Sequence, residues 1–377
     1  MLSFWERESF TEYDFLIIGG GIVGLSTAIE LKETHPHTNV AVVERGVFPS
    51  GASTRNAGFA CFGSLTEVLS DLEKLPEAAV FKLVKRRWDG LQLLRTRLGD
   101  EVIDYQNHGG YELLQTESQL GALEQADRVN SLLKPLFEHD VYQNVPEKTP
   151  ALGFDTNRVK GLVFNQYEAQ IHTGKMMKAL QRLAMARGID LLTGTGVRNF
   201  VEDNGHVDVK LENGTVLKAG RVGICTNAFT RKLVQEANLK PGRGVVLVTK
   251  PVQGLKFKGT FHYDEGYYYF RNYGNRIIFG GGRNLDLEGE TTTEFGVPDK
   301  ILSRLKEDLI NLILPGQSYE IEQVWSGIMA FGDTKQPVLR QQSDRVFLGV
   351  RLGGMGVAIG SLLGKELAEL ITQSGNN

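Results

Sequence analysis

The chain has 377 residues, of which 41% are apolar and 23% charged, and its formal charge is −3. This composition excludes a disordered chain and is typical of a globular protein with room for two ordinary domains. A slightly acidic chain without a basic tract also disfavours non-specific binding of nucleic acid.

Cysteine usage and the N-terminus favour a reduced, cytoplasmic protein. The two cysteines, Cys61 and Cys225, form no CxxC pair. The opening MLSFWERESFTEYD carries acidic residues where a signal peptide carries basic ones. The uncharged run at residues 15–29 is shorter than the ~20 apolar residues of a membrane span. We therefore expect a cytoplasmic location and no membrane span.

The first predicted elements are a strand at residues 15–18, a helix at 22–33 and a strand at 40–44. Gly19, Gly21 and Gly24 form G-x-G-x-x-G between the first strand and the helix. Such glycines allow a tight turn, a close pyrophosphate and close packing of helix on strand. Glu44 ends the second strand, where a carboxylate accepts hydrogen bonds from ribose hydroxyls and repels a 2′-phosphate. The unit predicts FAD or NAD as the ligand, and not NADP.

The next stretch combines a polar loop with helices. The loop STRNAG at residues 53–58 offers small side chains and backbone N–H groups that suit a pyrophosphate and a bulky ring, although an ordinary surface loop has the same composition. We expect helices at 77–98 and 117–137, with a strand at 111–115 between them. A further helix follows, with Thr173 as its N-cap and Gly188 as its C-cap.

From residue 190 the pattern changes to strands, and it returns to strand, turn and helix at the end. Strands are predicted at 190–193, 197–201, 207–211, 221–226, 245–249, 267–271 and 276–280, with a hairpin turn at Asn213 and Gly214. A helix at 300–313 ends before Pro315. A last strand ends at Gly349, and a glycine-rich turn leads into a helix that continues to about residue 371. Nucleotide-type units at both ends thus predict two domains interleaved in sequence.

Several segments resemble one known family. DFLIIGGGIVGLSTAIEL, VVERG and GASTRNAG near the start and RVFLGVRLGGMGVAIG near the end resemble the D-amino-acid oxidase superfamily of FAD-dependent oxidoreductases, which includes glycine oxidase and sarcosine oxidase. The resemblance implies an α/β plus α+β fold, with a Rossmann-like FAD-binding domain of the glutathione-reductase type interleaved with a mixed-sheet substrate domain. Residues 1–78, 155–235 and 325–377 would form the FAD-binding domain. Residues 79–154 and 236–324 would form the substrate or cap domain.

The same resemblance implies that non-covalent FAD lies between the two glycine units. It assigns Gly19, Gly21, Ile22, Val23 and Gly24 to the pyrophosphate, Glu44 and Arg45 to the adenosine ribose, Ser53, Thr54, Arg55, Asn56, Ala57 and Gly58 to the flavin, Val197 to the adenine, Thr226 and Asn227 to the ADP half, and Gly353, Gly354, Met355, Gly356 and Val357 to the isoalloxazine. Asn227 replaces a glycine of the family, and asparagine tolerates the positive φ that the turn needs. The helix after Gly356 would direct its positive end at the pyrimidine edge of the flavin, where charge collects on reduction.

The substrate side is predicted from a strand rich in aromatic residues. Tyr267, Tyr269 and Arg271 share one face of the strand and could enclose a substrate and hold its acidic group. A sheet face packed on helices, with Arg271 reaching solvent, explains the pattern equally well. Relatives carry an arginine for the substrate carboxylate where Met329 stands, so Arg271, Arg283 or Arg351 could replace it. We take Tyr267, Tyr269, Arg271, Met329 and Arg351 as the candidate substrate residues.

These features predict an FAD-dependent oxidoreductase that oxidises a C–N bond of an amino acid or secondary amine by hydride transfer to flavin N5. O2 or another acceptor would take the electrons. Because the oxygen-activating lysine of sarcosine oxidase has no match here, a dehydrogenase that passes electrons to another acceptor stays open beside an oxidase. The alternatives are C–O oxidation of a 2-hydroxy acid, a tRNA-modifying oxidase and a flavin protein without turnover. We expect no metal and no nucleic-acid partner. Cys61, after the flavin loop, could link the flavin or simply fill the core.

Overall fold

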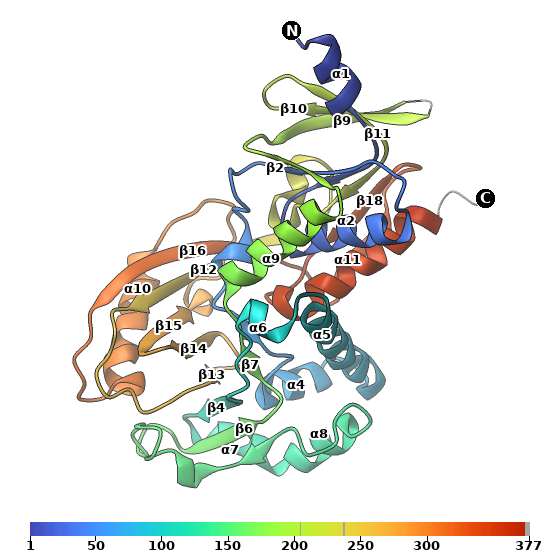
Figure 1. The fold of residues 1–377 in the computed structure, drawn as a ribbon. Helices are drawn as coiled ribbons and strands as arrows, with labels where there is room; N and C mark the ends of the chain where they lie inside the picture. The colour runs from blue at the N-terminus through green and yellow to red at the C-terminus, as the bar shows by residue number, and fades with distance from the viewer. Residues whose placement is uncertain (204, 237, 374–377) are drawn as a thin grey trace.

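The computed structural model describes residues 1–203, 205–236 and 238–373, and it has a mixed α/β fold built on two large sheets (Figure 1). The first sheet has the order β17-β18-β11-β1-β2-β8, with β10 paired to β11 and β9 to β10. Its strands are β1 (Glu12–Ile18), β2 (Val40–Glu44), β8 (Asp190–Thr193), β9 (Val197–Asp203), β10 (His206–Leu211), β11 (Val216–Ile224), β17 (Val338–Gln341) and β18 (Val346–Val350). The pairs β2–β8, β1–β2, β1–β11 and β11–β18 are parallel. Three segments that are far apart in the chain therefore form one sheet.

Helices cover the first sheet, and glycines let them approach closely. α2 (Ile22–Thr34) lies against α11 (Gly356–Gln373), and α11 also lies against α5 (Glu77–Leu98) (Figure 1). A Cβ atom on Gly364 of α11 would lie 2.6 Å from Cβ of Ser26, and one on Gly90 of α5 would lie 2.3 Å from the Ala358 carbonyl oxygen. Backbone thus meets backbone at both crossings, which anchors the N-terminus of α11 relative to the N-terminus of α2.

The second sheet has the order β16-β12-β15-β14-β13-β4-β6-β5, and its pairs are antiparallel except β13–β4. Its strands are β4 (Gly110–Leu114), β5 (Gln143–Asn144), β6 (Gly161–Asn165), β12 (Lys240–Thr249), β13 (Thr260–Tyr263), β14 (Tyr268–Tyr273), β15 (Arg276–Gly281) and β16 (Ile321–Phe331). Aromatic side chains such as Tyr268 and Phe270 form a core on one face, together with α10 (Asp299–Asp308). The opposite face is turned toward the first sheet.

A third layer of short helices closes the molecule. α4 (Leu65–Leu72), α7 (Glu117–Glu124) and α8 (Ala126–Leu133) share one apolar cluster. The remaining elements are α1 (Phe4–Phe10), α3 (Ala52–Arg55), α6 (Asp100–Ile103), α9 (Thr173–Ala186), β3 (Phe59–Ala60), β7 (Ala169–Gln170), three 3-10 turns (Pro146–Lys148, Asn227–Lys232 and Arg283–Leu285) and a π-helical turn (Leu309–Ile313). Within the described residues, no helix is long and apolar enough to cross a bilayer.

Three predicted elements need correction. The helix predicted at 117–137 is two helices, because the chain turns at Gln125 after a first helix that a Thr116–Gln119 capping box begins. The helix predicted at 300–313 leaves the α conformation at Leu309 and finishes as the π-helical turn. His172, and not Thr173, is the N-cap of α9, since the His172 ring accepts a hydrogen bond from the Lys175 N–H.

The predicted domain boundaries cut through the second sheet. β6 falls within 155–235, a stretch assigned to the FAD-binding domain, yet it pairs with β4 and β5. β16 crosses the boundary at residue 325 and pairs with β12 along its length. The ranges that the resemblance implies therefore divide paired strands of this sheet between the two domains. Residues 204, 237 and 374–377 of the predicted domains lie outside the described residues.

Candidate active site

A cavity of 590 Å³ lies between the first sheet and the inner face of the second sheet. Its size is in the range of cofactor and ligand pockets. The turn between β1 and α2 lines one end, and strands β12, β14 and β16 line the other. The first turn of α11 lies along the same cavity, so both glycine units of the sequence reach one continuous space.

The glycine turn after β1 is shaped by close backbone contacts. Gly19 has φ +114°, and a Cβ on Gly24 would lie 1.9 Å from the Gly19 carbonyl oxygen. A Cβ on Gly21 would lie 2.9 Å from Ser53 Oγ. Gly19, Gly21, Ile22 and Val23 line the cavity, whereas Gly24 packs the helix on its strand. Each glycine therefore occupies the kind of position that the motif predicts.

Glu44 stands at the end of β2 and lines the cavity. Its Oε2 accepts a hydrogen bond of 3.0 Å from the Gly20 N–H, and its Oε1 accepts bonds of 3.0 Å from the Gly46 N–H and from Ser50 Oγ. These bonds fix the carboxylate beside the glycine turn. The geometry suits a group that accepts hydrogen bonds from a ribose.

Further predicted residues surround the same end of the cavity. Arg45 stacks on the ring of Phe229 at 3.7 Å, and Val197, Thr226 and Asn227 line the wall. Asn227 has φ +46°, which agrees with the expectation of a positive φ there. Its Oδ1 also accepts a hydrogen bond of 3.0 Å from the Arg351 N–H, so the turn after β11 is joined to the end of β18.

The STRNAG loop is part of the cavity wall and is held in place by its own side chains. Ser53 Oγ accepts a hydrogen bond of 3.0 Å from the Ile22 N–H. Asn56 Oδ1 accepts bonds of 2.9 Å from the Gly58 N–H and from Thr173 Oγ1. Of the predicted flavin residues in this loop, Ser53, Arg55, Asn56 and Ala57 line the cavity, and Thr54 and Gly58 do not.

The turn before α11 presents bare backbone to the cavity. Gly353 and Gly354 have φ +56° and +86°. A Cβ on Gly353 or Gly356 would meet nothing within 4 Å, and one on Gly354 would lie 3.8 Å from Met329 Sδ. Space that side chains would fill is thus left open at the N-terminus of a long helix. A flat, anion-forming ring system fits this surface.

The inner face of the second sheet carries a row of residues in register. Val246, Gly280, Tyr269 and His262 pair across β12, β15, β14 and β13 in that order. A Cβ on Gly280 would lie 2.8 Å from the Tyr269 ring, so the ring covers the glycine. The Tyr269 hydroxyl has no hydrogen-bond partner among the described residues, and burial raises its pKa to about 12. It faces the cavity as a neutral donor.

Comparison with known proteins identifies the family of this chain. The family model "FAD dependent oxidoreductase" (DAO) matches residues 14–370. The chain belongs to this FAD-dependent oxidoreductase family. Glycine oxidase from Bacillus licheniformis is 23% identical over 95% of this chain and 93% of its own. The structures of L-proline dehydrogenase from P. horikoshii and glycine oxidase from Geobacillus kaustophilus each give a TM-score of 0.77, at 19% and 22% identity over 96% of this chain, covering 94% and 95% of theirs.

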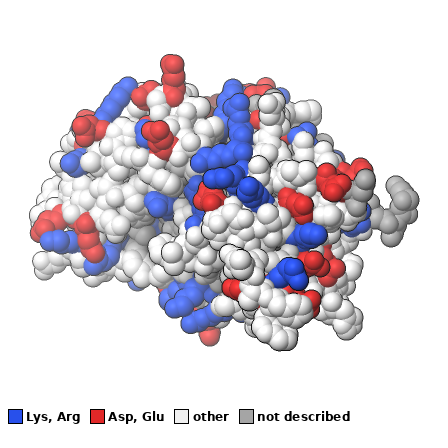
Figure 2. Space-filling view, turned by 90° about the horizontal axis from the view of Figure 1, so that it is seen from above, with Lys and Arg blue, Asp and Glu red and all other residues white. Residues whose placement is uncertain are grey.

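The chain is therefore an enzyme that uses FAD, and the cavity fits this cofactor. One end offers the glycine turn and Glu44 to the nucleotide, and the other offers bare backbone to the ring. The view in Figure 2 adds that Lys and Arg side chains gather in a band near the middle of one face, with acidic side chains interspersed elsewhere. Such a band attracts anionic groups such as phosphates.

Two of the predicted substrate arginines do not reach the cavity. Arg271 is buried and donates to the carbonyls of Ala57, Asn272 and Ile171, and burial lowers its pKa to about 10. Arg351 donates to the carbonyls of Asn238 and Gln336 at 2.8 and 2.7 Å. Each guanidinium is engaged by backbone of this chain. Their positions argue against the expectation that they hold a substrate.

Arg283, the third arginine considered for the substrate, does line the cavity. Its guanidinium lies over the Phe331 ring at 4.1 Å. Within the described residues no acceptor or carboxylate pairs with its side chain, and burial lowers its pKa. Tyr267, Tyr269 and Met329 line the same region. A half-buried guanidinium without a partner is available to an anionic ligand.

Sequence reasoning missed several residues on this side. Phe59 and His262 line the cavity, with their rings 5.1 Å apart, and Phe59 also meets Tyr269 at 5.5 Å. The signal was present in the hairpin: β13 and β14 are joined by a short turn, and pairing them places His262 opposite Tyr269. Cys61 lines the cavity too, and both cysteines are free and buried.

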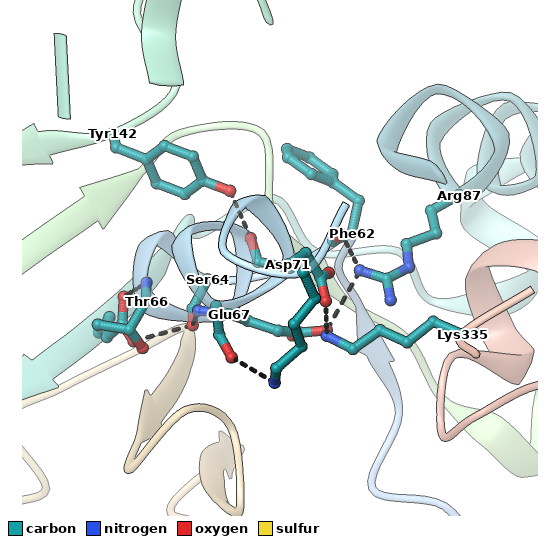
Figure 3. A network of polar contacts seen from close by, with 12 residues as sticks. Phe62, Ser64, Thr66, Glu67, Asp71, Arg87, Tyr142 and Lys335 are labelled. Carbon is teal, nitrogen blue, oxygen red and sulfur yellow. Dashed lines mark hydrogen bonds and ion pairs between the residues drawn. The ribbon is translucent and has the colours of Figure 1, made fainter. Parts of the chain in front are cut away.

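Glu67 and Lys335 line the cavity and belong to an ion-pair network that sequence reasoning also missed (Figure 3). Lys335 Nζ lies 3.1 Å from Glu67 Oε1 and 2.8 Å from Asp71 Oδ1, and Arg87 lies 3.2 Å from Glu67. Burial raises the pKa of Glu67, but Arg87 and Lys335 outweigh it and leave the pKa below its usual value. The network joins α4 to the loop between β16 and β17.

Proposed function

We propose that this enzyme oxidises the C–N bond of an amino acid or secondary amine that carries an anionic group. The relatives and neighbours reported above include glycine oxidases and an L-proline dehydrogenase, which supports a substrate of this class. The observation that carries the proposal is Arg283, whose guanidinium lines the cavity and stacks on Phe331 but has no carboxylate or hydrogen-bond acceptor among the described residues.

FAD, when bound, accepts the hydride that leaves the substrate carbon. Its adenosine end would be held by Glu44 and Arg45 and its pyrophosphate by the turn at Gly19 and Gly21. The bare backbone at Gly353 and Gly354 would support its ring system. These assignments follow from which residues line the cavity.

The substrate's anionic group would bind to Arg283. A guanidinium presents parallel N–H donors to a carboxylate, and stacking on Phe331 fixes its plane. The Tyr269 hydroxyl would donate a second hydrogen bond from the same wall. Phe59 and Met329 would exclude water and orient the reacting carbon toward the ring.

Anaerobic mixing of the FAD-loaded enzyme with a substrate panel tests the proposal. We expect glycine, sarcosine or proline to bleach the flavin absorbance, and methylamine, dimethylamine or pyrrolidine, which lack the carboxylate, to bleach it far more slowly. Bleaching by lactate or 2-hydroxyglutarate alone would overturn the proposal in favour of C–O oxidation.

A matched pair of variants tests the anchor. Arg283→Met should raise the substrate dissociation constant by at least tenfold, because a charge-assisted hydrogen bond to a buried guanidinium contributes about 1.5–3 kcal/mol. Arg158→Met removes an exposed arginine outside the cavity and should change nothing. Equal affinity in wild type and Arg283→Met would exclude Arg283 as the anchor.

A further inference from the structure

Three buried side chains form a group beside the substrate region. One ligand atom each of Cys61, Glu168 and His262 lie within 4.8 Å of one another. His262 Nε2 lies 2.9 Å from Glu168 Oε2, which also accepts a hydrogen bond of 3.1 Å from Thr260 Oγ1. Cys61 and His262 line the cavity, and Glu168 lies behind them. Glu168 thus orients the imidazole from the side away from the cavity, and the imidazole itself borders the cavity.

The group resembles a metal site in composition, but its geometry favours a shared proton. The Nε2–Oε2 contact of 2.9 Å is a hydrogen bond. We therefore treat Glu168 and His262 as an acid–base pair, with Cys61 as a neutral neighbour.

Carboxylates face the His262 imidazole from several elements. Glu168 contacts it directly, and Glu67 approaches from α4 with its own charge held by Arg87 and Lys335. Glu112 pairs with His262 in register across β4, but burial raises the pKa of Glu112, so it contributes less negative charge. Cys61 and Tyr269 are uncharged neighbours, because burial raises both their pKa values. Such surroundings disfavour an anion beside His262 and attract a cation.

The second ring nitrogen of His262 is available to that cation. With Nε2–H donated to Glu168, Nδ1 carries a lone pair, and it forms no hydrogen bond to any described residue. Burial lowers the pKa of His262, but Glu168 outweighs burial, so the pKa is raised above its usual value of about 6.5. The imidazole is neutral, and able to accept a proton, above that raised pKa.

We propose that His262, oriented by Glu168, is the catalytic base that takes the proton from the substrate's ammonium group. This role rests on the proposed amine oxidation and names its proton acceptor. Arg283, beyond strand β14 from His262, would hold the anionic end of the same molecule. Together, Arg283 and His262 would favour a substrate that carries both an anionic group and an ammonium group.

The proton and electron balance of the step is simple. The N–H bond of the ammonium breaks, its electron pair stays on nitrogen, and the proton moves to Nδ1 of His262. The neutral amine could then release its α-hydrogen with both bonding electrons, as the hydride that bound FAD would accept, and water would hydrolyse the resulting carbon–nitrogen double bond. Glu168 stabilises the imidazolium until its proton returns to solvent.

A ligand that cannot react tests the role without turnover. 2-Aminoisobutyrate has an ammonium and a carboxylate but no α-hydrogen, and isobutyrate is the same acid without nitrogen. Their dissociation constants are measured from the change in flavin absorbance of the FAD-loaded enzyme between pH 5.5 and 9. For wild type, the dissociation constant of 2-aminoisobutyrate should fall about tenfold per pH unit up to a midpoint above 6.5 and then level off. Isobutyrate should show no such fall.

Two variants identify the titrating group. His262→Asn should abolish the pH dependence. Glu168→Gln should move the midpoint to lower pH, because the carboxylate that raises the pKa of His262 most is lost, while burial still lowers this pKa and only Glu112 and Glu67 oppose it. An unchanged profile in His262→Asn, or an unmoved or higher midpoint in Glu168→Gln, would overturn the role. If His262→Asn fails to bind FAD, the Glu168→Gln midpoint alone decides. Loss of amine bleaching in wild type would instead refute the proposed function.

Discussion

At the residue scale, the two parts of the Tyr269 side chain have different roles, one in the stability of the fold and one in ligand binding. Its hydroxyl faces the FAD cavity without a described partner, while its ring covers Gly280 and meets Phe59. The ring therefore supports the sheet, and the hydroxyl is free for a ligand. Tyr269→Phe should leave the free energy of unfolding within about 0.5 kcal/mol of wild type, since no internal hydrogen bond is lost. It should also weaken substrate binding about fivefold to tenfold.

Urea unfolding and anaerobic flavin reduction measure these two effects on the same preparations. Tyr263→Phe is the matched control, because the Tyr263 hydroxyl donates a 2.8 Å hydrogen bond to Asp308 on the other face of the sheet. It should cost stability and leave substrate affinity unchanged. A Tyr269→Phe enzyme that loses stability but binds substrate normally would reverse our assignment.

Glu44 gives a second test at this scale. Its carboxylate is fixed by three backbone or hydroxyl donors beside the glycine turn. Glu44→Gln should weaken FAD binding about tenfold, because an ionised acceptor binds ribose hydroxyls more strongly than an amide does. Apoprotein fluorescence titrated with FAD measures the affinity, and Glu12→Gln, on an exposed site, is the control. Equal affinities would place the ribose elsewhere.

How far the role of a single residue can be predicted from the sequence depends on how many residues separate it from its partners along the chain. Tyr267 and Tyr269 both line the cavity, but strand alternation does not explain this, because Tyr267 lies in the turn before β14 and Arg271, on the same predicted face, does not line the cavity. The engagement of Arg271 could not be predicted, since its acceptors at Ala57 and Ile171 are 214 and 100 residues away. Arg283 was named only as a possible replacement and was left out of the candidate substrate residues, whereas the fold places it, and not Arg271 or Arg351, at the cavity.

At the element scale, the crossing of α2 and α11 sets the distance between the two glycine units. Gly364 allows the contact, because an added Cβ would lie 2.6 Å from Cβ of Ser26 and 2.8 Å from the Val23 carbonyl oxygen. Gly364→Ala should therefore destabilise the protein by about 1–3 kcal/mol, although alanine is the better helix former.

Gly121→Ala is the control for this prediction. Gly121 lies in α7 with nothing within 4 Å of its missing Cβ, so alanine should stabilise the protein by about 0.5–1 kcal/mol. Urea unfolding of both variants measures the difference. Stabilisation by Gly364→Ala would mean that the two helices do not cross as described.

Helices and strands could be predicted where the sequence patterns that define them lie within a short stretch of the chain. The GxGxxG turn and its helix, the strand β2 and the closing strand–turn–helix follow from spacing and hydrophobic runs. The break at Gln125 was missed because the apolar pattern continues across it. The position of His262 was missed because no strand was predicted at residues 260–263, where β13 pairs with β14.

At the scale of the whole molecule, the cavity is closed by segments from both ends of the chain and by the second sheet. A ligand that contacts all of them should stabilise the folded state strongly. FAD at 100 times its dissociation constant should add about 2.7 kcal/mol to the free energy of unfolding of the apoprotein.

Thermal unfolding of the apoprotein with FAD, FMN or ADP tests this expectation. FAD should raise the melting temperature well above the value reached with FMN or ADP. The reason is that the two ends of the cavity, for the nucleotide and for the ring, are formed by different parts of the chain. A rise with FMN equal to that with FAD would mean that the glycine turn and Glu44 do not hold the adenosine half.

The interleaving of domains was foreseeable from the two glycine units, whereas the boundaries depended on strand pairing such as that of β6.

The most direct measurement is a crystal structure of the FAD-loaded enzyme with 2-aminoisobutyrate. It should show one FAD extending from Gly19 to Gly354, with the ligand between its ring and Tyr269, the carboxylate on Arg283 and the nitrogen beside His262. A flavin outside this cavity, or a ligand whose carboxylate is remote from Arg283, would contradict the account.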